Sequence, residues 1–236
     1  MRPRSHGNGL TVCGRFALTG DLDFYRDYYA IADGPSEPLA PSWNLAPTDR
    51  AYVVSPDPGG LTLTTMAWGL IPHWSSDTGT IHINARAETI ATKPAFRSAL
   101  ARHRCLVPAD GFYEWEPKEQ GRTAHWIYRA DGFPITFAGI WSAWKDPRGG
   151  WERNFSIVTT ASRGIIAPLH DRMPVMLPDD WWGAWLDPSV DDPQAALSLI
   201  RTMDPELLME HRVSSRVNSV RNNGPELRDP VRETLF

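Results

Sequence analysis

Cys13 is the first residue in this chain with distinctive chemistry, and it stands in the run Val12-Cys13-Gly14-Arg15. At a chain start, a cysteine combines an α-amine of pKa about 8 with a thiol of pKa about 8.5, so both nucleophiles are available near neutral pH. The amine can condense with an aldehyde, and the thiol can then close on the same carbon to form a thiazolidine. We therefore predict aldehyde chemistry at an N-terminal Cys13, with an ordinary buried and inert cysteine as the alternative.

The segment before Cys13 decides between these interpretations. Met1 to Val12 has neither the apolar core of a signal peptide nor the amphipathic, Arg/Ser-rich length of a transit peptide. We expect residues 1–12 to be a disordered or untranslated leader. In this hypothesis Val12 marks an alternative start codon, and the initiator methionine is removed because the following cysteine is small.

Two further residues have acid–base potential. Glu114 lies within the aromatic run Phe112-Tyr113-Glu114-Trp115, and an apolar wall would raise its pKa and make it a general acid. The alternative is a strand-edge glutamate that faces water. His170 precedes Asp171-Arg172, so its polar neighbours could set its tautomer or charge, although a structural histidine remains the alternative.

Asn84 and Arg86 alternate on a segment that we expect to be extended, so both side chains would point to one face. The amide would supply neutral hydrogen bonds and the guanidinium would match a phosphate. A cross-strand polar pair without a ligand is the alternative.

Composition excludes several classes of protein. The 236 residues are 42% hydrophobic and 22% charged, as in an ordinary globular domain. Two cysteines are too few for a disulfide scaffold or a cysteine-based zinc site. No HExxH or CxxC motif or carboxylate cluster indicates a metal site, and we predict no cofactor. Gly-x-Ser-x-Gly is missing, so a Ser-His-Asp hydrolase is only weakly supported. No apolar run approaches the length of a membrane span.

Charge and aromatic content favour a local nucleic-acid surface. The net charge is −4, which argues against a wholly basic protein but leaves room for a patch. Arg86, Lys93, Arg97, Arg102 and Arg104 form a basic run, whereas residues 179–210 are acidic. Eleven tryptophans would suit stacking with unpaired bases, although a solvated charged face and a tryptophan-rich core are the alternatives.

The elements that must position these residues follow no regular βαβ rhythm, so we predict the α+β class. The expected strands are 51–55, 61–68, 104–108, 125–129, 135–141 and 154–160. The expected helices are 21–29, 94–101, 179–186 and 194–201. Segments 35–47 and 146–150 are expected to be loops within a single domain, residues 13–236.

The ordered motifs of the chain closely resemble the SRAP family, the SOS response-associated peptidases, which are abasic-site processing proteins of the HMCES and YedK type. The resemblance extends from Cys13 to about Leu227. The motifs are Cys13-Gly14-Arg15-Phe16, Asn44-Leu45-Ala46-Pro47-Thr48, Trp68-Gly69-Leu70-Ile71-Pro72, Asn84-Ala85-Arg86-Ala87-Glu88, Gly111-Phe112-Tyr113-Glu114-Trp115 and His170-Asp171-Arg172-Met173-Pro174. It implies mostly antiparallel sheets that curve into a partly open barrel with flanking helices.

The resemblance also implies roles for individual residues. An N-terminal Cys13 would capture the ring-opened abasic deoxyribose of single-stranded DNA as a thiazolidine. Glu114 would assist ring opening and proton transfer, Asn84 would orient the sugar or nucleophile, and His170 would act at the imine and in reversal. The residues implied to contact DNA are Arg15, Pro47, Trp68, Pro72, Trp74, Arg86, Arg97, Trp115 and Thr159.

One departure from the family pattern concerns the position of the cysteine, which in the family directly follows the initiator methionine. The peptidase name implies self-removal of a leader as a second route to a free Cys13. The family further implies lyase chemistry and junctions of single- and double-stranded DNA as a preferred site. By default we expect a monomer, and the composition leads us to expect no membrane association and a cytoplasmic location, on the nucleoid in a bacterium. Two other function classes stay open: an N-terminal-cysteine peptidase or amidohydrolase, and a non-covalent binding module for single-strand junctions.

Overall fold

The computed structural model describes residues 13–118, 121–147 and 149–231. The expected leader, residues 1–12, lies outside the described residues. The strands are β1 (Arg15–Leu18), β2 (Ser42–Leu45), β3 (Arg50–Asp57), β4 (Gly60–Trp68), β5 (Asn84–Arg86), β6 (Arg104–Ala109), β7 (Gly111–Pro117), β8 (Arg122–Arg129), β9 (Ile135–Lys145), β10 (Trp151–Ala161), β11 (Arg172–Pro174) and β12 (Leu208–Arg212). The α-helices are α1 (Leu22–Tyr28), α2 (Pro94–Arg102), α3 (Trp182–Leu186) and α4 (Pro193–Leu197). Short 3₁₀ helices are η1 (Gly164–Ile166), η2 (Asp179–Trp181), η3 (Pro205–Leu207), η4 (Ser215–Asn218) and η5 (Pro225–Arg228).

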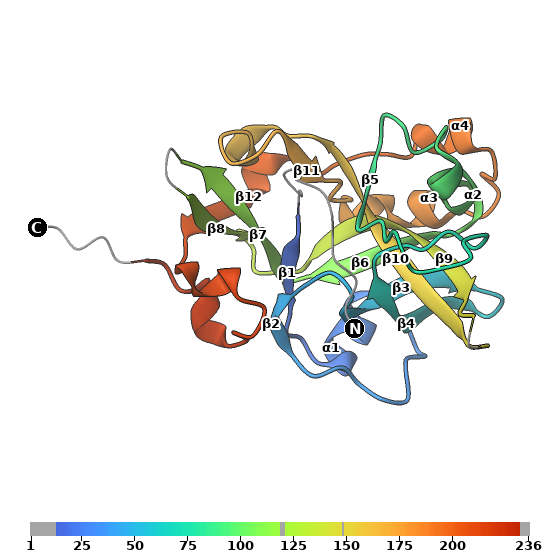
Figure 1. Ribbon diagram of the computed structural model, residues 1–236, viewed down its shortest axis with the longest axis horizontal. Helices are drawn as coiled ribbons and strands as arrows, with labels where there is room; N and C mark the ends of the chain where they lie inside the picture. The colour runs from blue at the N-terminus through green and yellow to red at the C-terminus, as the bar shows by residue number, and fades with distance from the viewer. Residues whose placement is uncertain (1–12, 119–120, 148, 232–236) are drawn as a thin grey trace, which may run out of the picture.

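The strands form two sheets that curve around a shared core as a partly open barrel (Figure 1). The first sheet has the order β12-β8-β7-β1-β2, and the second has the order β11-β10-β4-β3-β6-β9 with β5 beside β10. Pairing is antiparallel except where β10 runs parallel to β4 and β5. Helices α2, α3 and α4 gather at one end of the second sheet (Figure 1). This arrangement confirms the predicted α+β class with mostly antiparallel sheets.

Alternation of side chains gives the first sheet two buried faces. On the inward face, Phe16 of β1, Phe112 of β7 and Ile127 of β8 are fully buried in the large core. On the opposite face, Tyr113 and Trp126 pack in a second cluster. Valines and a leucine of the C-terminal segment close that cluster: Val213, Val217 and Leu227. Residues along one strand therefore alternate between the two clusters, as a period of two requires.

The structure confirms the predicted strands and, in the described residues 146–147 and 149–150, the predicted loop, but corrects three other predictions. Segment 35–47 is not entirely a loop, because Ser42–Leu45 pairs with β1 as strand β2. The helix expected at 179–186 divides into η2 and α3. The helix expected at 194–201 ends at Leu197, and the Leu199 carbonyl accepts a hydrogen bond from the Trp181 indole at 3.0 Å. That tertiary contact takes the place of a further helical turn.

Arg104 does not belong to the surface patch expected from the sequence. Its side chain is buried and donates hydrogen bonds to the backbone carbonyls of Leu100, Ala101, Trp185, Asp187 and Val190. These acceptors belong to the ends of α2 and α3 and the turn after α3. The guanidinium therefore joins helix ends to β6, and a carbonyl cluster of this kind replaces its lost hydration.

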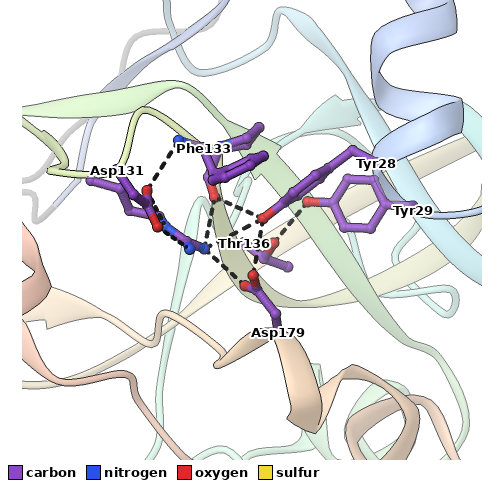
Figure 2. A network of polar contacts seen from close by, with 8 residues as sticks. Tyr28, Tyr29, Asp131, Phe133, Thr136 and Asp179 are labelled. Carbon is purple, nitrogen blue, oxygen red and sulfur yellow. Dashed lines mark hydrogen bonds and ion pairs between the residues drawn. The ribbon is translucent and has the colours of Figure 1, made fainter.

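A second buried arginine joins β8 to α1 and η2 through the network of Figure 2. Arg129, at the end of β8, binds both carboxylate oxygens of Asp131 at 3.0 and 2.6 Å. It also donates to Asp179 of η2 at 2.8 Å and to the Tyr28 hydroxyl of α1 at 3.3 Å. Since a planar guanidinium presents donors in a fixed fork, one side chain can tie together three elements.

The change Arg129→Lys should therefore destabilise the fold although it keeps the charge. An ammonium group cannot make the bidentate contact with Asp131 and reach Asp179 at the same time, so we expect a loss of about 2 kcal/mol in the free energy of unfolding. Urea unfolding at neutral pH measures this difference. The exposed Arg221 gives a matched control in Arg221→Lys, and equal losses in both variants would contradict the role of the network.

Candidate active site

The candidate site begins where β1 and β7 pair. The register Phe16↔Phe112 and Arg15↔Tyr113 places the residues before Arg15 beside the second half of β7. The backbone nitrogen of Cys13 donates a hydrogen bond to Glu114 Oε2 at 2.9 Å. Two residues that are 101 positions apart in the sequence are thus in direct contact.

Glu114 is an acid whose environment changes its chemistry. Its side chain is on the inward, apolar face, and the residue is only 1% exposed. Burial raises the pKa of Glu114 to about 7, against the opposing effect of the Cys13 hydrogen bond, and the charge of Asp171 raises it further. The 1% exposure confirms the burial expected from the aromatic motif. A carboxyl with a pKa near neutrality can both donate and accept a proton.

Cys13 combines features of both interpretations drawn from the sequence. It is completely buried, and burial together with the nearby Glu114 carboxylate raises the pKa of its thiol well above the ordinary value. Its φ of 45° lies in the left-handed region, which is strained for a residue with a side chain. The thiol is therefore shielded, while the nitrogen is held by the acid.

His170 lies between η1 and β11, after the turn at 167–169, and is also buried. Its Nδ1 is 3.0 Å from the backbone N–H of Arg172 and 2.8 Å from Asp171 Oδ1. The first contact requires a bare nitrogen lone pair and the second requires a protonated nitrogen, so only one can be a good hydrogen bond at a time. The tautomer of His170 therefore decides which of the two partners Nδ1 binds.

Strand β10 brings the remaining polar residues into one region. Asn84 pairs with Ile157, and Thr159 pairs with Arg86 on one side and with Pro174 of β11 on the other. Thr159 is buried. The segments that carry Asn84, Arg86 and His170 therefore flank a single strand end.

Arg172 is a site residue that sequence reasoning named only within a motif. It makes a bidentate ion pair with Glu88 at 2.7 and 2.9 Å and donates to the Thr159 carbonyl at 2.7 Å. These contacts fix the segment that follows β5 against β11, next to His170. Glu88 and Arg172 each belong to one of the motifs quoted above, and this was the only signal in the sequence.

The sequence also did not predict a role for Asn44, which was named only within a motif. Arg15 donates to Asn44 Oδ1 at 2.8 Å and to the Val217 carbonyl at 3.0 Å. The amide nitrogen of Asn44 donates in turn to the carbonyls of Val217, Ser219 and Asn222. Arg15, expected to hold a phosphate, is thus partly occupied in joining the C-terminal segment to β1.

The other residues expected to contact DNA differ in their exposure to solvent. Trp74 is 60% exposed and Arg97 is exposed, whereas Pro47 and Trp115 are half-buried and Pro72 is buried. The Trp115 indole donates to Asn218 Oδ1 at 2.8 Å. Trp68 does not fit the expected role, because it is fully buried against Phe16 and has no exposed face for a base. We assign it to the support of β1.

In the part of the chain that the structure describes, no group of three or more His, Cys, Asp or Glu side chains is placed to hold a metal ion. Over the same residues, no helix is long and apolar enough to span a membrane.

Comparison with known proteins yields a consistent set of relatives. The family model of SOS response associated peptidase (SRAP) matches residues 12–220. The abasic site processing protein YoqW of Bacillus subtilis is 37% identical over 92% of this chain and 98% of its own length. YedK of Escherichia coli, with the same description, is 32% identical over 93% of this chain and 100% of its own. A solved structure from Bacteroides thetaiotaomicron has the same fold, with a TM-score of 0.80 at 24% identity, over 93% of this chain and 100% of that chain.

The raised pKa of Glu114 predicts how stability depends on pH. Glu114 stays protonated up to about pH 7 in the folded state but only up to about pH 4.5 in the unfolded chain. The protonated carboxyl therefore contributes its full stabilisation of the fold below about pH 4.5, and this contribution is lost as the pH rises through about 7. Compared with Glu114→Gln, the wild type should lose about 3 kcal/mol over this range, at about 1.4 kcal/mol per pH unit.

Urea unfolding at a series of pH values measures the difference. The change Glu206→Gln, at an exposed glutamate, is the matched control and should leave the pH dependence of the wild type unchanged. Parallel pH curves for the wild type and Glu114→Gln would contradict the raised pKa.

Proposed function

The chain belongs to the SRAP family, and on this basis we propose that it processes abasic sites by forming a covalent thiazolidine between Cys13 and the ring-opened deoxyribose of single-stranded DNA. The observation that carries the proposal is the 2.9 Å hydrogen bond from the Cys13 nitrogen to Glu114. It holds an acid–base group on the atom that would attack the sugar aldehyde. The relatives' description as abasic site processing proteins supports the same substrate.

The reaction can be written with all atoms and protons balanced. The neutral α-amine of Cys13 attacks the aldehyde carbon and gives a carbinolamine; Glu114 then protonates its hydroxyl, which leaves as water and gives an iminium ion. The Cys13 sulfur adds to that carbon, and the thiol proton passes to the Glu114 carboxylate. The sum is aldehyde plus aminothiol giving thiazolidine plus water, with Glu114 regenerated.

Burial of the thiol suits this order of steps. A thiol with a raised pKa is not ionised to the thiolate at neutral pH. It therefore reacts only after the imine carbon is placed next to it. Asn84 would orient the sugar, and His170 would supply or remove protons at the imine and in reversal. An open imine also permits β-elimination, which accounts for a lyase activity that ring closure suppresses.

The same geometry supports self-removal of the leader. With Val12 attached, a water molecule from solvent would add to the Val12 carbonyl carbon, and the Cys13 nitrogen would leave as the amine, which Glu114 is in position to protonate. The products are the leader with a free Val12 carboxylate and a chain with a free Cys13 amine. The left-handed φ of Cys13 depends on the preceding carbonyl, so cleavage would also relieve that strain. A free Cys13 amine would then form in place next to its own acid–base partner.

The DNA partner would lie along the exposed cationic and aromatic groups. Arg86, Arg97 and Trp74 are exposed and offer phosphate and stacking contacts, while Pro47, Pro72 and Trp115 would line the lesion. Base readout is not expected, because the lesion has no base. We propose that the protein works as a monomer in the cytoplasm, on the nucleoid in a bacterium, with a preference for single-strand/double-strand junctions and without a cofactor.

The change Cys13→Ala should abolish a covalent adduct with an oligonucleotide that contains one abasic site, because it removes the sulfur that closes the ring. Glu114→Gln should slow adduct formation by about a hundredfold, since it removes the proton donor. Denaturing electrophoresis measures both. Cys105→Ala, at the other buried cysteine, is the matched control and should form the adduct as the wild type does.

Other outcomes of this assay identify the alternatives. A persistent adduct in Cys13→Ala would contradict the nucleophile assignment. A wild-type complex that is only non-covalent and weakens as salt rises would indicate a binding module. Hydrolysis of peptide or amide substrates without any adduct would indicate an N-terminal-cysteine hydrolase.

Intact-mass measurement of the protein produced from its own gene tests the requirement for a free Cys13. We expect a species that begins at Cys13. The variant Glu114→Gln distinguishes the two routes: initiation at codon 12 gives this species in both proteins, whereas self-removal leaves the leader on the variant. A wild-type chain found only with Met1 attached would contradict the proposal.

A further inference from the structure

On the inward face of the first sheet, polar side chains continue from Glu114 toward solvent. This polar strip consists of Glu114, Glu116, His125 and Glu210. Glu114 of β7 is directly opposite His125 of β8, and Glu116 follows Glu114 on the same face. Across β8, His125 pairs with Arg212 of β12, so Glu210 lies on this face as well. Directly opposed residues in a sheet have their Cβ atoms about 5 Å apart, which places the imidazole next to the candidate acid.

His125 is held between two carboxylates. Its Nδ1 is 2.6 Å from Glu210 Oε2, and its Nε2 is 3.6 Å from Glu116 Oε2. The His125 side chain is only 6% exposed, whereas those of Glu116 and Glu210 are 31% and 34% exposed. Among the described residues, neither His125 Nε2 nor Glu116 Oε2 has a hydrogen-bond partner, although both atoms are buried. His125 Nε2 and Glu116 Oε2 therefore face each other, and one proton could form a hydrogen bond between them.

We propose that His125, with Glu116 and Glu210, is a positioning residue of this site: it conducts protons between solvent and the Glu114 carboxyl. The inference rests on the proposed function, in which Glu114 gives up and regains a proton within each turnover. With 1% exposure, Glu114 has little direct access to water, and the substrate would cover the Cys13 side. The strip supplies a second route from the opposite side.

Proton transfer along the strip balances at each step. Glu210 takes a proton from solvent and passes it to His125 Nδ1, while His125 Nε2 releases one to Glu116 Oε2. The imidazole keeps its number of protons and exchanges its tautomer. Glu116 passes the proton to Glu114, two residues back on the same face, directly or through one water molecule. The reverse sequence removes a proton from Glu114.

The other charged groups near the strip are few. Arg212 lies opposite His125 on β12. Arg122, at the start of β8, and Asp171 act on the Glu114 carboxyl with opposite sign, the arginine lowering its pKa and the aspartate raising it. His125 thus lies directly opposite Glu114 and is held between Glu116 and Glu210.

The first test uses the protein without DNA and follows the imidazole signals of His125 by NMR during a pH titration. In the wild type the Glu114 carboxyl loses its proton near pH 7, so the His125 ring signals should show a titration step there. Glu114→Gln should remove that step, because no negative charge then appears opposite the imidazole. Glu206→Gln, at an exposed glutamate outside the strip, should leave it unchanged. Titration of His125 that does not respond to Glu114→Gln would overturn the inference.

The second test measures adduct formation with the abasic oligonucleotide. His125→Gln should slow it by about tenfold, and added imidazole should restore the rate by delivering protons from solution. Thr123→Val, on the same face of β8, is the matched control at wild-type rate, and thermal unfolding checks that each variant is folded. A wild-type rate in His125→Gln, or a slow rate that imidazole does not raise, would overturn the relay.

The two tests separate the relay from the proposed function. If the wild type forms no adduct while the titrations of His125 and Glu114 are coupled, the proposed function is wrong and the proton connection stands. If the adduct forms and the titrations are independent, the function stands and the relay is wrong.

Discussion

Burial of the Glu114 carboxyl against the Cys13 nitrogen is the constraint on which the rest of the site depends. An ionised carboxylate in an apolar wall is unfavourable, and the hydrogen bond from Cys13 offsets only part of that cost. The contact exists only because β1 and β7 pair in one register. A shift of one residue would turn Glu114 to the opposite face of the sheet. The core residues Phe16 and Phe112, which hold that register, are thus part of the chemistry.

The C-terminal segment supports the same strands from the other side. Asn44 and Arg15 bind its backbone carbonyls, and Val217 and Leu227 cover Tyr113. Because Tyr113 and Glu114 are neighbours on β7, one strand has its outer face fixed by hydrophobic packing and its inner face fixed by the site. Both faces of a single strand must be satisfied before the acid is correctly placed.

The second sheet supplies Asn84, Arg86 and His170 to the site, and it does so through its parallel strand pairing. Parallel pairing of β5 with β10 brings Asn84 and Arg86 to the same strand end as β11 and His170. The ion pair of Arg172 with Glu88 then fixes the two segments together. The motifs are separated by long stretches of chain, and the sheet brings them together.

The sequence by itself determined the residue types: a cysteine next to a plausible start, an acid in an aromatic run, and the β-rich pattern that indicates an α+β fold. Local patterns suffice there, because propensity and alternation are encoded within a few residues. Only the tertiary structure decided that Arg104 is buried, that Trp68 supports the core, that 42–45 is a strand and that His125 faces Glu114. These outcomes depend on long-range register and burial, which arise from contacts between distant segments and leave no periodic signal in the chain.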